Sequence, residues 1–387
     1  MKILMVLDHE FPADVRVEKE IKTLVAAGHK VELACFTRQG RNGYEEKDGY
    51  VIHRKPISTF TYKSSVGCLK FPFYFNFWRE YLTSLLANGV YDALHIHDLP
   101  LAQVGAEMKK KFGIRFVLDL HENWPALLQV SAHTNTTLGK LLSSDSQWRA
   151  YERNYVSKAD RVVVVADEMK QRLVSTGIEN SFYVVPNTLG KETYAGLTTT
   201  TDSHFITLFY AGGLNFHRGV HVVIEAISKL TQYPNIRFRI VGSGKYEEAL
   251  KAMARNLKVE GKVEFMGWKS QTEVYEILNQ SNIALIPHLR NEHTDNTSPN
   301  KLFQYMLAGK PVLSSDCRYI KNILDETGAG ICYEDTNPED FASKLKPLLD
   351  SPDLRVSMGQ KGVAAIRDKY NWENTSRELL RLYEELI

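Results

Sequence analysis

The chain has 387 residues, which suits two domains of ordinary size better than one small domain. Hydrophobic residues make up 43% and charged residues 24%, as in soluble globular proteins, and a formal net charge of +2 gives no reason to expect nucleic acid as a partner. The four cysteines form no CxxC pair, which argues against structural zinc and favours a reducing compartment.

No segment has the character of a targeting or membrane-spanning sequence. The N-terminal apolar run MKILMVL is too short for a signal peptide, and no run approaches the roughly 20 apolar residues that cross a bilayer. We therefore expect a cytoplasmic protein.

Apolar runs of strand length alternate with amphipathic helical stretches along most of the chain, a pattern typical of doubly wound parallel sheets. In the first half, strands are predicted at 2–7, 31–35, 93–97, 116–120, 161–165 and 182–185. In the second half, they are predicted at 206–210, 237–241, 263–266, 283–287 and 312–314. A stretch rich in Thr, Gly and Ser, residues 187–203, separates the two series and predicts a linker.

The fold class that follows is α/β, with two Rossmann-like domains facing each other across a cleft. We predict an N-terminal domain over 1–187, a linker over 188–202, a C-terminal domain over 203–370 and a terminal helix over 371–387. Sheets of this kind bind ligands beyond the carboxyl ends of their strands, so the strand ends are where site residues are expected.

The first strand is followed by DHEFPADVRVEKE, which contains no G-x-G-x-x-G. That absence argues against a nicotinamide-dependent oxidoreductase. Asp14 and Arg16 lie at the start of the helix after this loop. They either bind a ligand, or cap the helix and pair with Glu20.

Residues 54–81 are unusually rich in aromatic side chains, as in KFPFYFNFWREY. One interpretation is a core helix that packs on the sheet. The other is peripheral contact with a membrane surface, with rings among the lipid headgroups and Lys70 and Arg79 on anionic lipids. The sequence leaves both open.

Histidines end two neighbouring strands of the first half. In HIHD, alternation places His95 and His97 on one face of the sheet, with Asp98 beyond them. These residues could bind a metal, but no further group of ligands follows at a useful spacing, so a ligand-lining role is favoured. In LDLHENWP, His121 ends the next strand beside Glu122, where an imidazole can donate to a bound ligand.

The stretch TDNTSPNKLFQYMLAGKPV, residues 294–312, predicts a polar turn, a helix and a strand. Thr297 or Ser298 is expected to cap the helix, with Pro299 in its first turn. A helix that begins in this way offers unpaired backbone amides at its positive end, which favours phosphate. The amides concerned are those of Asn300, Lys301 and Leu302.

This stretch resembles the donor-binding segment of retaining glycosyltransferases of family 4, which have the GT-B fold. That family commonly carries two glutamates eight positions apart, the second followed by a helix and G-x-P-[VI]. Here G-K-P-V places Asn296 and Gln304 at those positions, and S-P-x-K-L-F-x-Y-M indicates a branch of the family. The resemblance implies that Gln304 binds the donor ribose and Asn296 lies near the donor sugar, with Asp295 and Glu292 as neighbouring carboxylates.

The loop AGGLNFHRG after the strand 206–210 resembles the family's G-R-L-x-x-x-K-G loop, whose cations neutralise the donor diphosphate. Gly213 stands where the arginine would be and Arg218 where the lysine would be, so Lys301 is expected to supply a second charge. The turn VGSG, with Gly244, approaches the nucleotide in the family. Trp268 in MGWK either stacks on the base or belongs to the core.

The resemblance also implies that His121 contacts the donor sugar and its phosphate, and that the terminal helix crosses back onto the N-terminal domain. The predicted site residues are, as catalytic candidates, His121, Asp295 and Asn296; as donor-binding residues, Gly213, Arg218, Gly244, Ser298, Asn300, Lys301, Leu302 and Gln304; and on the acceptor side, Arg16, His97, Asp98 and Glu122.

The implied function is retaining transfer of a sugar from a UDP- or GDP-sugar to a hydroxyl of a glycan or lipid-linked acceptor, in polysaccharide biosynthesis. The family works without a divalent metal, so neither a metal nor another cofactor is expected. Two alternatives stay open: a non-catalytic relative that binds nucleotide-sugars, because both motif carboxylates are replaced, and a GT-B nucleotide-sugar epimerase.

Overall fold

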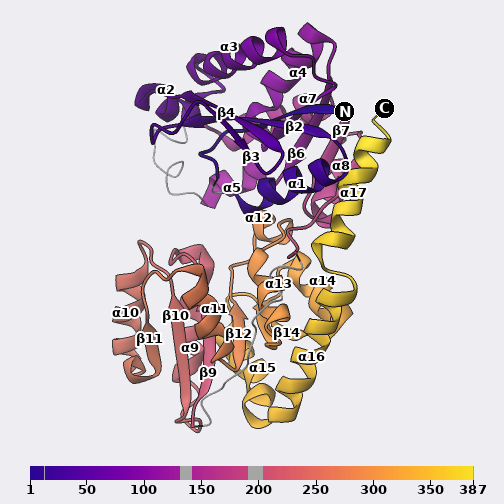
Figure 1. The fold of residues 1–387 in the computed structure, drawn as a ribbon. Coiled ribbons are helices and arrows are strands. Elements are labelled where there is room, and N and C mark those ends of the chain that lie inside the picture. Colours follow the sequence, from indigo (N-terminus) through magenta and orange to yellow (C-terminus); the bar gives the residue numbers. More distant parts are fainter. Residues whose placement is uncertain (13, 131–141, 191–203, 387) are drawn as a thin grey trace. The chain divides into compact units, whose positions relative to one another are not determined.

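The structure, a computed structural model, describes residues 1–12, 14–130, 142–190 and 204–386 (Figure 1). The chain forms two compact units. The N-terminal unit comprises Met1–Pro186 and Thr375–Ile387, and the C-terminal unit comprises Asn187–Asn374. Most of the predicted linker, from residue 191 onward, lies outside the described residues.

The N-terminal unit is built on an eight-stranded sheet in the order β3-β4-β2-β1-β5-β6-β7-β8. All pairs are parallel except β3 with β4. The strands are β1 (Lys2–Leu7), β2 (Lys30–Thr37), β3 (Tyr44–Lys47), β4 (Tyr50–Pro56), β5 (Ala93–His97), β6 (Arg115–Leu120), β7 (Arg161–Val164) and β8 (Phe182–Val184).

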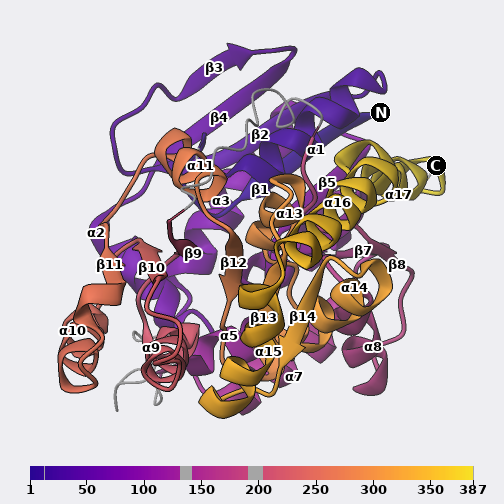
Figure 2. The same ribbon diagram turned by 90° about the horizontal axis from the view of Figure 1, so that it is seen from below.

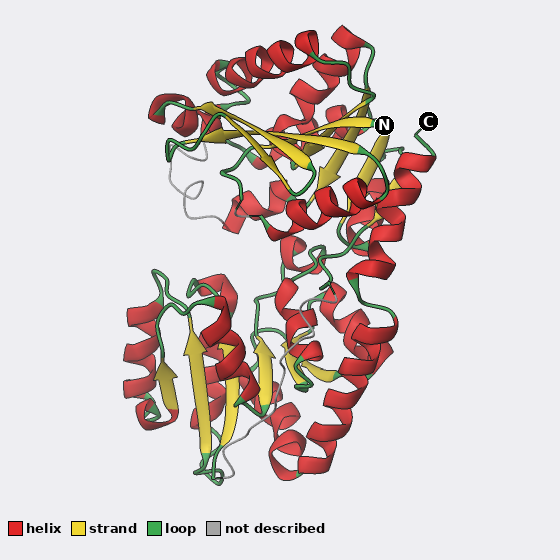
Figure 3. Ribbon diagram, in the orientation of Figure 1, coloured by secondary structure: helices red, strands yellow, loops and turns green. Residues whose placement is uncertain are grey.

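Helices cover both faces of this sheet (Figure 3). They are α1 (Val15–Ala26), α2 (Thr59–Lys63), α3 (Phe73–Asn88), α4 (Ala102–Phe112), α5 (Trp124–Val130), α7 (Asp145–Val156), α8 (Asp167–Ser175) and the C-terminal part of α17 (Trp372–Glu384). Asp14 caps α1 by accepting the amides of Arg16 and Val17, as the capping alternative predicts.

The C-terminal unit is built on six parallel strands in the order β11-β10-β9-β12-β13-β14. They are β9 (Ile206–Ala211), β10 (Ile236–Val241), β11 (Val263–Phe265), β12 (Ile283–Ile286), β13 (Val312–Ser315) and β14 (Gly330–Tyr333). The strand order reverses between β9 and β12, which is the switch point where open α/β sheets bind ligands.

In this unit α9, α10 and α15 cover one face of the sheet and α11, α13 and α16 the other (Figure 2). The helices are α9 (Val220–Ser228), α10 (Glu247–Asn256), α11 (Gln271–Asn279), α12 (Glu292–Asp295), α13 (Asn300–Leu307), α14 (Arg318–Thr327), α15 (Pro338–Asp350) and α16 (Pro352–Asp368). The predicted fold class, two Rossmann-like α/β domains, is confirmed.

Every strand predicted from the sequence is present, and three more were missed. β3 and β4 form a hairpin at an edge of the sheet, where YEEK offers no apolar alternation. β14 has only four residues. These strands lack the continuous apolar run that marks a strand buried on both faces.

The last helix completes the core of the N-terminal unit. Leu379, Leu382 and Tyr383 on α17 have no exposed surface. The Tyr383 hydroxyl lies 2.7 Å from Nδ1 of His95, a residue of β5 in the middle of the sheet. Within the described residues, no helix combines the length and the apolar character that a bilayer crossing requires.

Candidate active site

The candidate donor site lies at the switch point of the C-terminal unit. The loop 212–219 follows β9, and His288 lies two residues beyond β12, the neighbouring strand. The loop contains a short 3₁₀ turn, Phe216–Arg218, which ends at Gly219. Gly219 has a φ of 69°, and a Cβ there would meet the Pro287 carbonyl oxygen at 1.6 Å, so only glycine fits.

Two glycine turns interlock beside this loop. A Cβ on Gly242 would lie 2.0 Å from the Gly212 carbonyl oxygen, and one on Gly244 would lie 2.2 Å from that of Leu214. The Leu214 amide also donates to the Ser243 carbonyl at 3.0 Å. Gly244 is therefore a contact between two loops, and its predicted role toward a nucleotide stays a prediction.

Gly213 differs from these glycines because it has space around it. A Cβ there would meet only the Asn215 amide nitrogen, at an ordinary 3.6 Å. Its backbone is outside the left-handed region, and the residue is exposed. Nothing in the loop geometry therefore requires glycine at the position where the resembling family carries arginine.

Arg218 and Lys301 converge on His288. Nη1 of Arg218 lies 3.3 Å from Nε2 of His288, and Nζ of Lys301 lies 3.4 Å from the same atom. Nζ of Lys301 also donates to the Ala211 carbonyl at 2.8 Å and lies 4.6 Å from the centre of the Tyr210 ring. The structure thus brings Lys301 beside Arg218, as expected for a second cation. We call Arg218, Lys301 and His288 the cation cluster.

The positive charges of Arg218 and Lys301 repel each other. Burial and then the charge of Arg218 lower the pKa of Lys301 to about 7. Burial, followed by the charges of Lys301 and Arg218, holds the pKa of His288 well below its usual value. A neutral His288 with its proton on Nδ1 can accept from both cations through Nε2.

Within the part of the chain that the structure describes, no carboxylate balances this cluster. Among the described residues, neither Arg218 nor Lys301 forms an ion pair with an acidic side chain, and the buried Nε of Arg218 has no hydrogen-bond partner. Both cations are half-buried, and a partly desolvated cation without a counter-ion is costly, so the cluster favours the binding of an anion.

The amino end of α13 adds donors to the same place. Its N-cap residue is Pro299, and no side chain caps the helix, so the prediction of a Thr297 or Ser298 cap is wrong. Among the described residues, the amides of Asn300 and Lys301 have no hydrogen-bond partner. The Leu302 amide donates to Pro299, which corrects the expectation that it is free.

Ser298 is buried and has a structural role. Its hydroxyl accepts the Asn187 amide at 3.2 Å and donates to the Tyr319 hydroxyl at 2.9 Å. Gln304, by contrast, is half-buried and lies beside the Tyr275 hydroxyl. Its predicted contact with a ribose stays a prediction.

The catalytic candidates of this unit are tied into the protein. Asp295 pairs with Arg290 at 3.1 Å and accepts the Arg318 amide at 2.7 Å, at the start of α14. The Asn296 side chain is buried, donates to the Glu292 carbonyl and accepts from Arg318. Both residues therefore stabilise the turn before α13. The Asp295 carboxylate already binds Arg290 and the Arg318 amide, and Asn296 carries no carboxylate.

The N-terminal unit contains a different polar group, buried between α1 and the sheet. Arg16 lies 3.0 Å from Glu20 and 3.1 Å from Asp119, and it donates to the Val185 carbonyl at 2.7 Å. The pairing with Glu20 is the structural alternative that the sequence left open. Burial and then the Asp119 carboxylate raise the pKa of Glu20 to about 8.

His121 belongs to the same buried network. Its Nε2 lies 3.1 Å from Nδ1 of His97 and 3.6 Å from Asp119, and its Nδ1 lies 3.8 Å from Asp98. Burial alone would lower the pKa of His121, but the carboxylates of Asp98 and Asp119 raise it to about 10. The imidazole is therefore a cation at neutral pH.

The predicted acceptor-side residues are mostly buried in this network. Arg16 and Asp98 are buried, and His97 has no exposed surface, so His97 lines no surface of the unit. Glu122 is half-buried. Sequence analysis missed Asp119, the carboxylate at the centre of the network, although it immediately precedes the last residue of a predicted strand.

The network also resembles a metal site. Glu20 and Asp119 lie with His95 and His97 close enough for one ligand atom of each to surround an ion. The expectation that no further ligands accompany the two histidines is thus wrong. The guanidinium of Arg16, however, already contacts both carboxylates and supplies the positive charge there.

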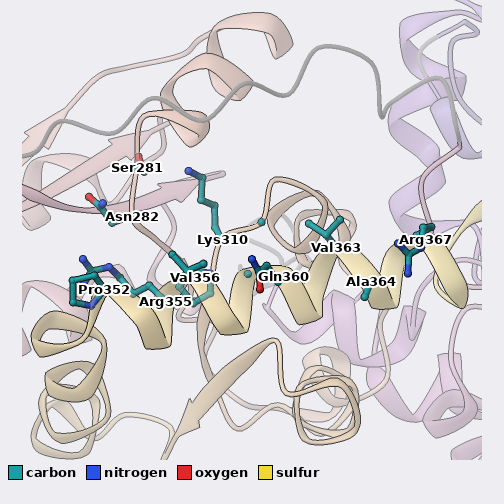
Figure 4. Close-up of a pocket in the computed structure, with 13 residues that line it drawn as sticks. Ser281, Asn282, Lys310, Pro352, Arg355, Val356, Gln360, Val363, Ala364 and Arg367 are labelled. Carbon is teal, nitrogen blue, oxygen red and sulfur yellow. The ribbon is translucent and has the colours of Figure 1, made fainter.

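Two other features lie outside the cation cluster. Trp268 is 77% exposed, which excludes the core alternative for this residue. A cavity of about 510 Å³ lies along α16, and Val356, Gln360 and Lys310 are among the residues that line it (Figure 4). It opens at the amino ends of β12 and β13, and none of the predicted site residues lines it.

Comparisons with known proteins agree with this architecture. Residues 13–189 match the family model described as Glycosyltransferase Family 4, and residues 199–364 match that described as Glycosyl transferases group 1. An uncharacterized glycosyltransferase of Methanocaldococcus jannaschii, MJ1178, is 24% identical over 100% of this chain and 99% of its own length.

Solved structures share the fold. The sucrose-phosphate synthase of Thermosynechococcus elongatus superposes with a TM-score of 0.77 at 15% identity, over 100% of this chain and 98% of that one. Anabaena Alr3699/HepE, solved in complex with UDP, superposes with a TM-score of 0.69 at 12% identity, over 100% of both chains. With a family 4 domain followed by a group 1 domain, the chain is a glycosyltransferase of this kind with the GT-B fold.

Proposed function

We propose that this glycosyltransferase moves a sugar from a nucleoside diphosphate donor to a hydroxyl of a glycan or lipid-linked acceptor, with retention at the anomeric carbon. The observation that carries the proposal is the cation cluster, in which Arg218 and Lys301 lie together without a carboxylate. A diphosphate supplies the negative charge that balances these cations, and two backbone amides at the amino end of α13 can donate hydrogen bonds to it.

The cluster also suits the chemistry of the leaving group. As the bond from the anomeric carbon to the phosphate oxygen breaks, negative charge grows on the diphosphate. Arg218, protonated Lys301 and the amide of Asn300 are fixed donors that stabilise this charge more strongly in the transition state than in the ground state.

Retention is explained by substitution on one face of the sugar. The acceptor oxygen forms its bond to the anomeric carbon on the side from which the phosphate departs, and the leaving phosphate oxygen takes the acceptor proton. This step needs no nucleophilic side chain. It fits a site in which Asp295 pairs with Arg290 and caps α14.

The donor is proposed to be a UDP- or GDP-sugar, and no metal is required because the cluster itself neutralises the diphosphate. The complex of Anabaena Alr3699/HepE with UDP supports the first of these nucleotides. Trp268 follows β11 and is exposed, and we propose that its ring stacks on the base.

The test is incubation of the purified chain with UDP- and GDP-sugars and a panel of glycan and lipid-linked acceptors, with products analysed by NMR. Transfer with the donor's anomeric configuration, without added metal, is expected. Inverted product contradicts retention. An epimerised donor without acceptor product identifies an epimerase, and donor binding without any reaction identifies a non-catalytic relative.

Two variants of the cation cluster, and one control variant outside it, link the reaction to the cluster. Arg218→Met and Lys301→Met remove the charges but keep much of the apolar volume. Both are expected to lose donor affinity, whereas Lys310→Met, in the cavity along α16, is expected to retain it. Equal affinity in all three variants would contradict the assignment.

A further inference from the structure

We propose that exposed aromatic residues of the N-terminal unit form a docking surface for an anionic lipid bilayer. The surface, called here the aromatic patch, consists of Phe60 and Tyr62 on α2 and Phe71 and Phe73 at the start of α3. This inference goes beyond sugar transfer, and its test needs neither donor nor acceptor.

The aromatic segment divides into a buried and an exposed part. Tyr74, Phe75 and Trp78 on α3 are at most 3% exposed and belong to the core, as the core-helix interpretation predicts. Phe60 is 65% exposed and Phe73 47% exposed, and neither contributes appreciably to that core. Burial of the helix therefore explains only some of the aromatic residues.

Three of the exposed rings, those of Phe60, Phe71 and Phe73, adjoin one another, whereas the Tyr62 ring on α2 packs against Phe36. The ring centres of Phe60 and Phe73 lie 5.2 Å apart, and those of Phe71 and Phe73 lie 6.4 Å apart. Phe71 is 48% exposed and Tyr62 is 38% exposed. Grouped aromatic surface of this kind, unlike a single exposed ring, is a mark of an interaction site.

The charges around the patch favour an anionic partner. Residues 54–79 include five lysines and arginines and no acidic residue, but Arg54 and Arg79 are paired with Glu45 and Glu107. Lys63, at the end of α2, and Lys70, directly before Phe71, are both exposed. The guanidinium of Arg38 lies 4.1 Å from the centre of the Tyr62 ring, which adds a third cation.

A bilayer surface matches this combination of side chains. Aromatic rings are stable at the depth of the headgroups, and lysine and arginine bind the lipid phosphates around them. A second copy of this chain matches it less well. In a two-fold contact the same cations would meet one another with no acidic partner in the segment.

The patch adjoins the strand ends of its own unit. Tyr74 follows Phe73 directly, and its hydroxyl donates at 3.2 Å to Asp8, the residue after β1. The predicted acceptor-side residue Asp98 follows β5, the strand next to β1. A bilayer held at the patch would bring the headgroup of a lipid-linked acceptor to this edge of the sheet.

The test is sedimentation of the full chain with vesicles of phosphatidylcholine, and with vesicles that contain about one third phosphatidylglycerol. The unmodified chain is expected to sediment with the anionic vesicles and to be released by high salt. The triple variant Phe60→Ser, Phe71→Ser, Phe73→Ser is expected to bind at least about tenfold more weakly, because three rings leave the interface.

Matched controls separate the patch from general effects. Val90→Ser with Val174→Ser removes exposed apolar side chains elsewhere on the same unit, and it should leave vesicle binding unchanged. Lys63→Glu should weaken binding to anionic vesicles, whereas Lys110→Glu on α4 should not. Circular dichroism checks that each variant is folded.

Three results would overturn the proposal. The first is a chain that does not sediment with either kind of vesicle. The second is a triple variant, folded, that binds as the unmodified chain does. The third is a dimer in sedimentation equilibrium that the triple variant abolishes, which would assign the patch to a second copy.

Discussion

Both units bring cations and histidines together near the ends of their central strands, but the surroundings of these cations differ in charge. In the N-terminal unit, His121 lies against Asp98 and Asp119, and its pKa rises to about 10. In the C-terminal unit, Lys301 lies beside Arg218 with no carboxylate among the described residues, and its pKa falls to about 7.

The difference separates a structural network from a binding site. A network whose charges already balance needs no ligand, and its ion pairs and hydrogen bonds hold the fold together. A group of cations without a counter-ion is incomplete, and an anion completes it. The presence of carboxylates beside the first group, and their absence beside the second among the described residues, therefore supports the proposal that the second group binds an anion.

The largest expected effect is on stability, and it should be confined to the balanced network. Asp119→Asn removes the carboxylate that lies between the buried cations Arg16 and His121, and Glu20 remains beside Arg16. We expect a loss of about 3–5 kcal/mol in the free energy of unfolding by urea. Lys301→Met removes a cation that has no counter-ion, so a change within about 1 kcal/mol is expected.

The exposed pair Lys321–Asp325 provides the control for this comparison. Asp325→Asn should cost at most about 1 kcal/mol, because solvent screens the pair. If Asp119→Asn costs no more than Asp325→Asn, the network is not the balanced structure described above.

The second effect is on donor binding, and it should be confined to the cation cluster. Arg218→Met and Lys301→Met should each weaken UDP binding by about 1–3 kcal/mol, the usual cost of a lost charged hydrogen bond. Isothermal titration calorimetry measures both. Asp119→Asn, compared at a temperature where it is folded, should bind UDP with unchanged affinity.

The third effect is a pH dependence of donor affinity. Below pH 7, Lys301 is already protonated and binds the diphosphate at full strength. Above pH 7 it must first take up a proton, so the affinity for a UDP-sugar should fall by up to about tenfold per pH unit as the pH rises toward 9. A UDP-sugar is used because its diphosphate does not titrate in this range.

Lys301→Arg is the control for the pH dependence. Arginine keeps its charge throughout, so its affinity should be flat between pH 7 and 9. A slope that persists in Lys301→Arg would assign the titration to another group.

The smallest expected effect is a gain in affinity for UDP. Gly213→Arg places a cation in the open position of the loop, and UDP binding should become about tenfold tighter, as for one added charged hydrogen bond. Gly213→Ala should change little. Gly244→Ala should destabilise the unit, because its Cβ would meet the Leu214 carbonyl at 2.2 Å.

Much of the fold was predictable because parallel strands buried on both faces have continuous apolar sequences. β1, with KILMVL, and β5, with ALHIH, match the predicted bounds in full. The hairpin of β3 and β4 was not predictable, since an edge strand with YEEK needs its partner to be recognised.

The candidate site was predictable where a residue follows a strand or begins a helix, as Arg218 and Lys301 do. His288 was missed because its role depends on the two cations that meet at its ring. Ser298 was misassigned because capping depends on side-chain direction, and its hydroxyl instead contacts Tyr319. The spacing of residues in the sequence shows neither the contacts between distant residues nor the direction of a side chain.

The contact between Tyr383 and His95 has a practical consequence for building chimaeras. The N-terminal half cannot be exchanged as a single contiguous gene fragment, since one of the partners of its central histidine is encoded at the far end of the sequence. A graft of residues 1–186 from this protein must carry the closing segment of α17 with it. Without that segment, water would reach the charged interior beneath β5.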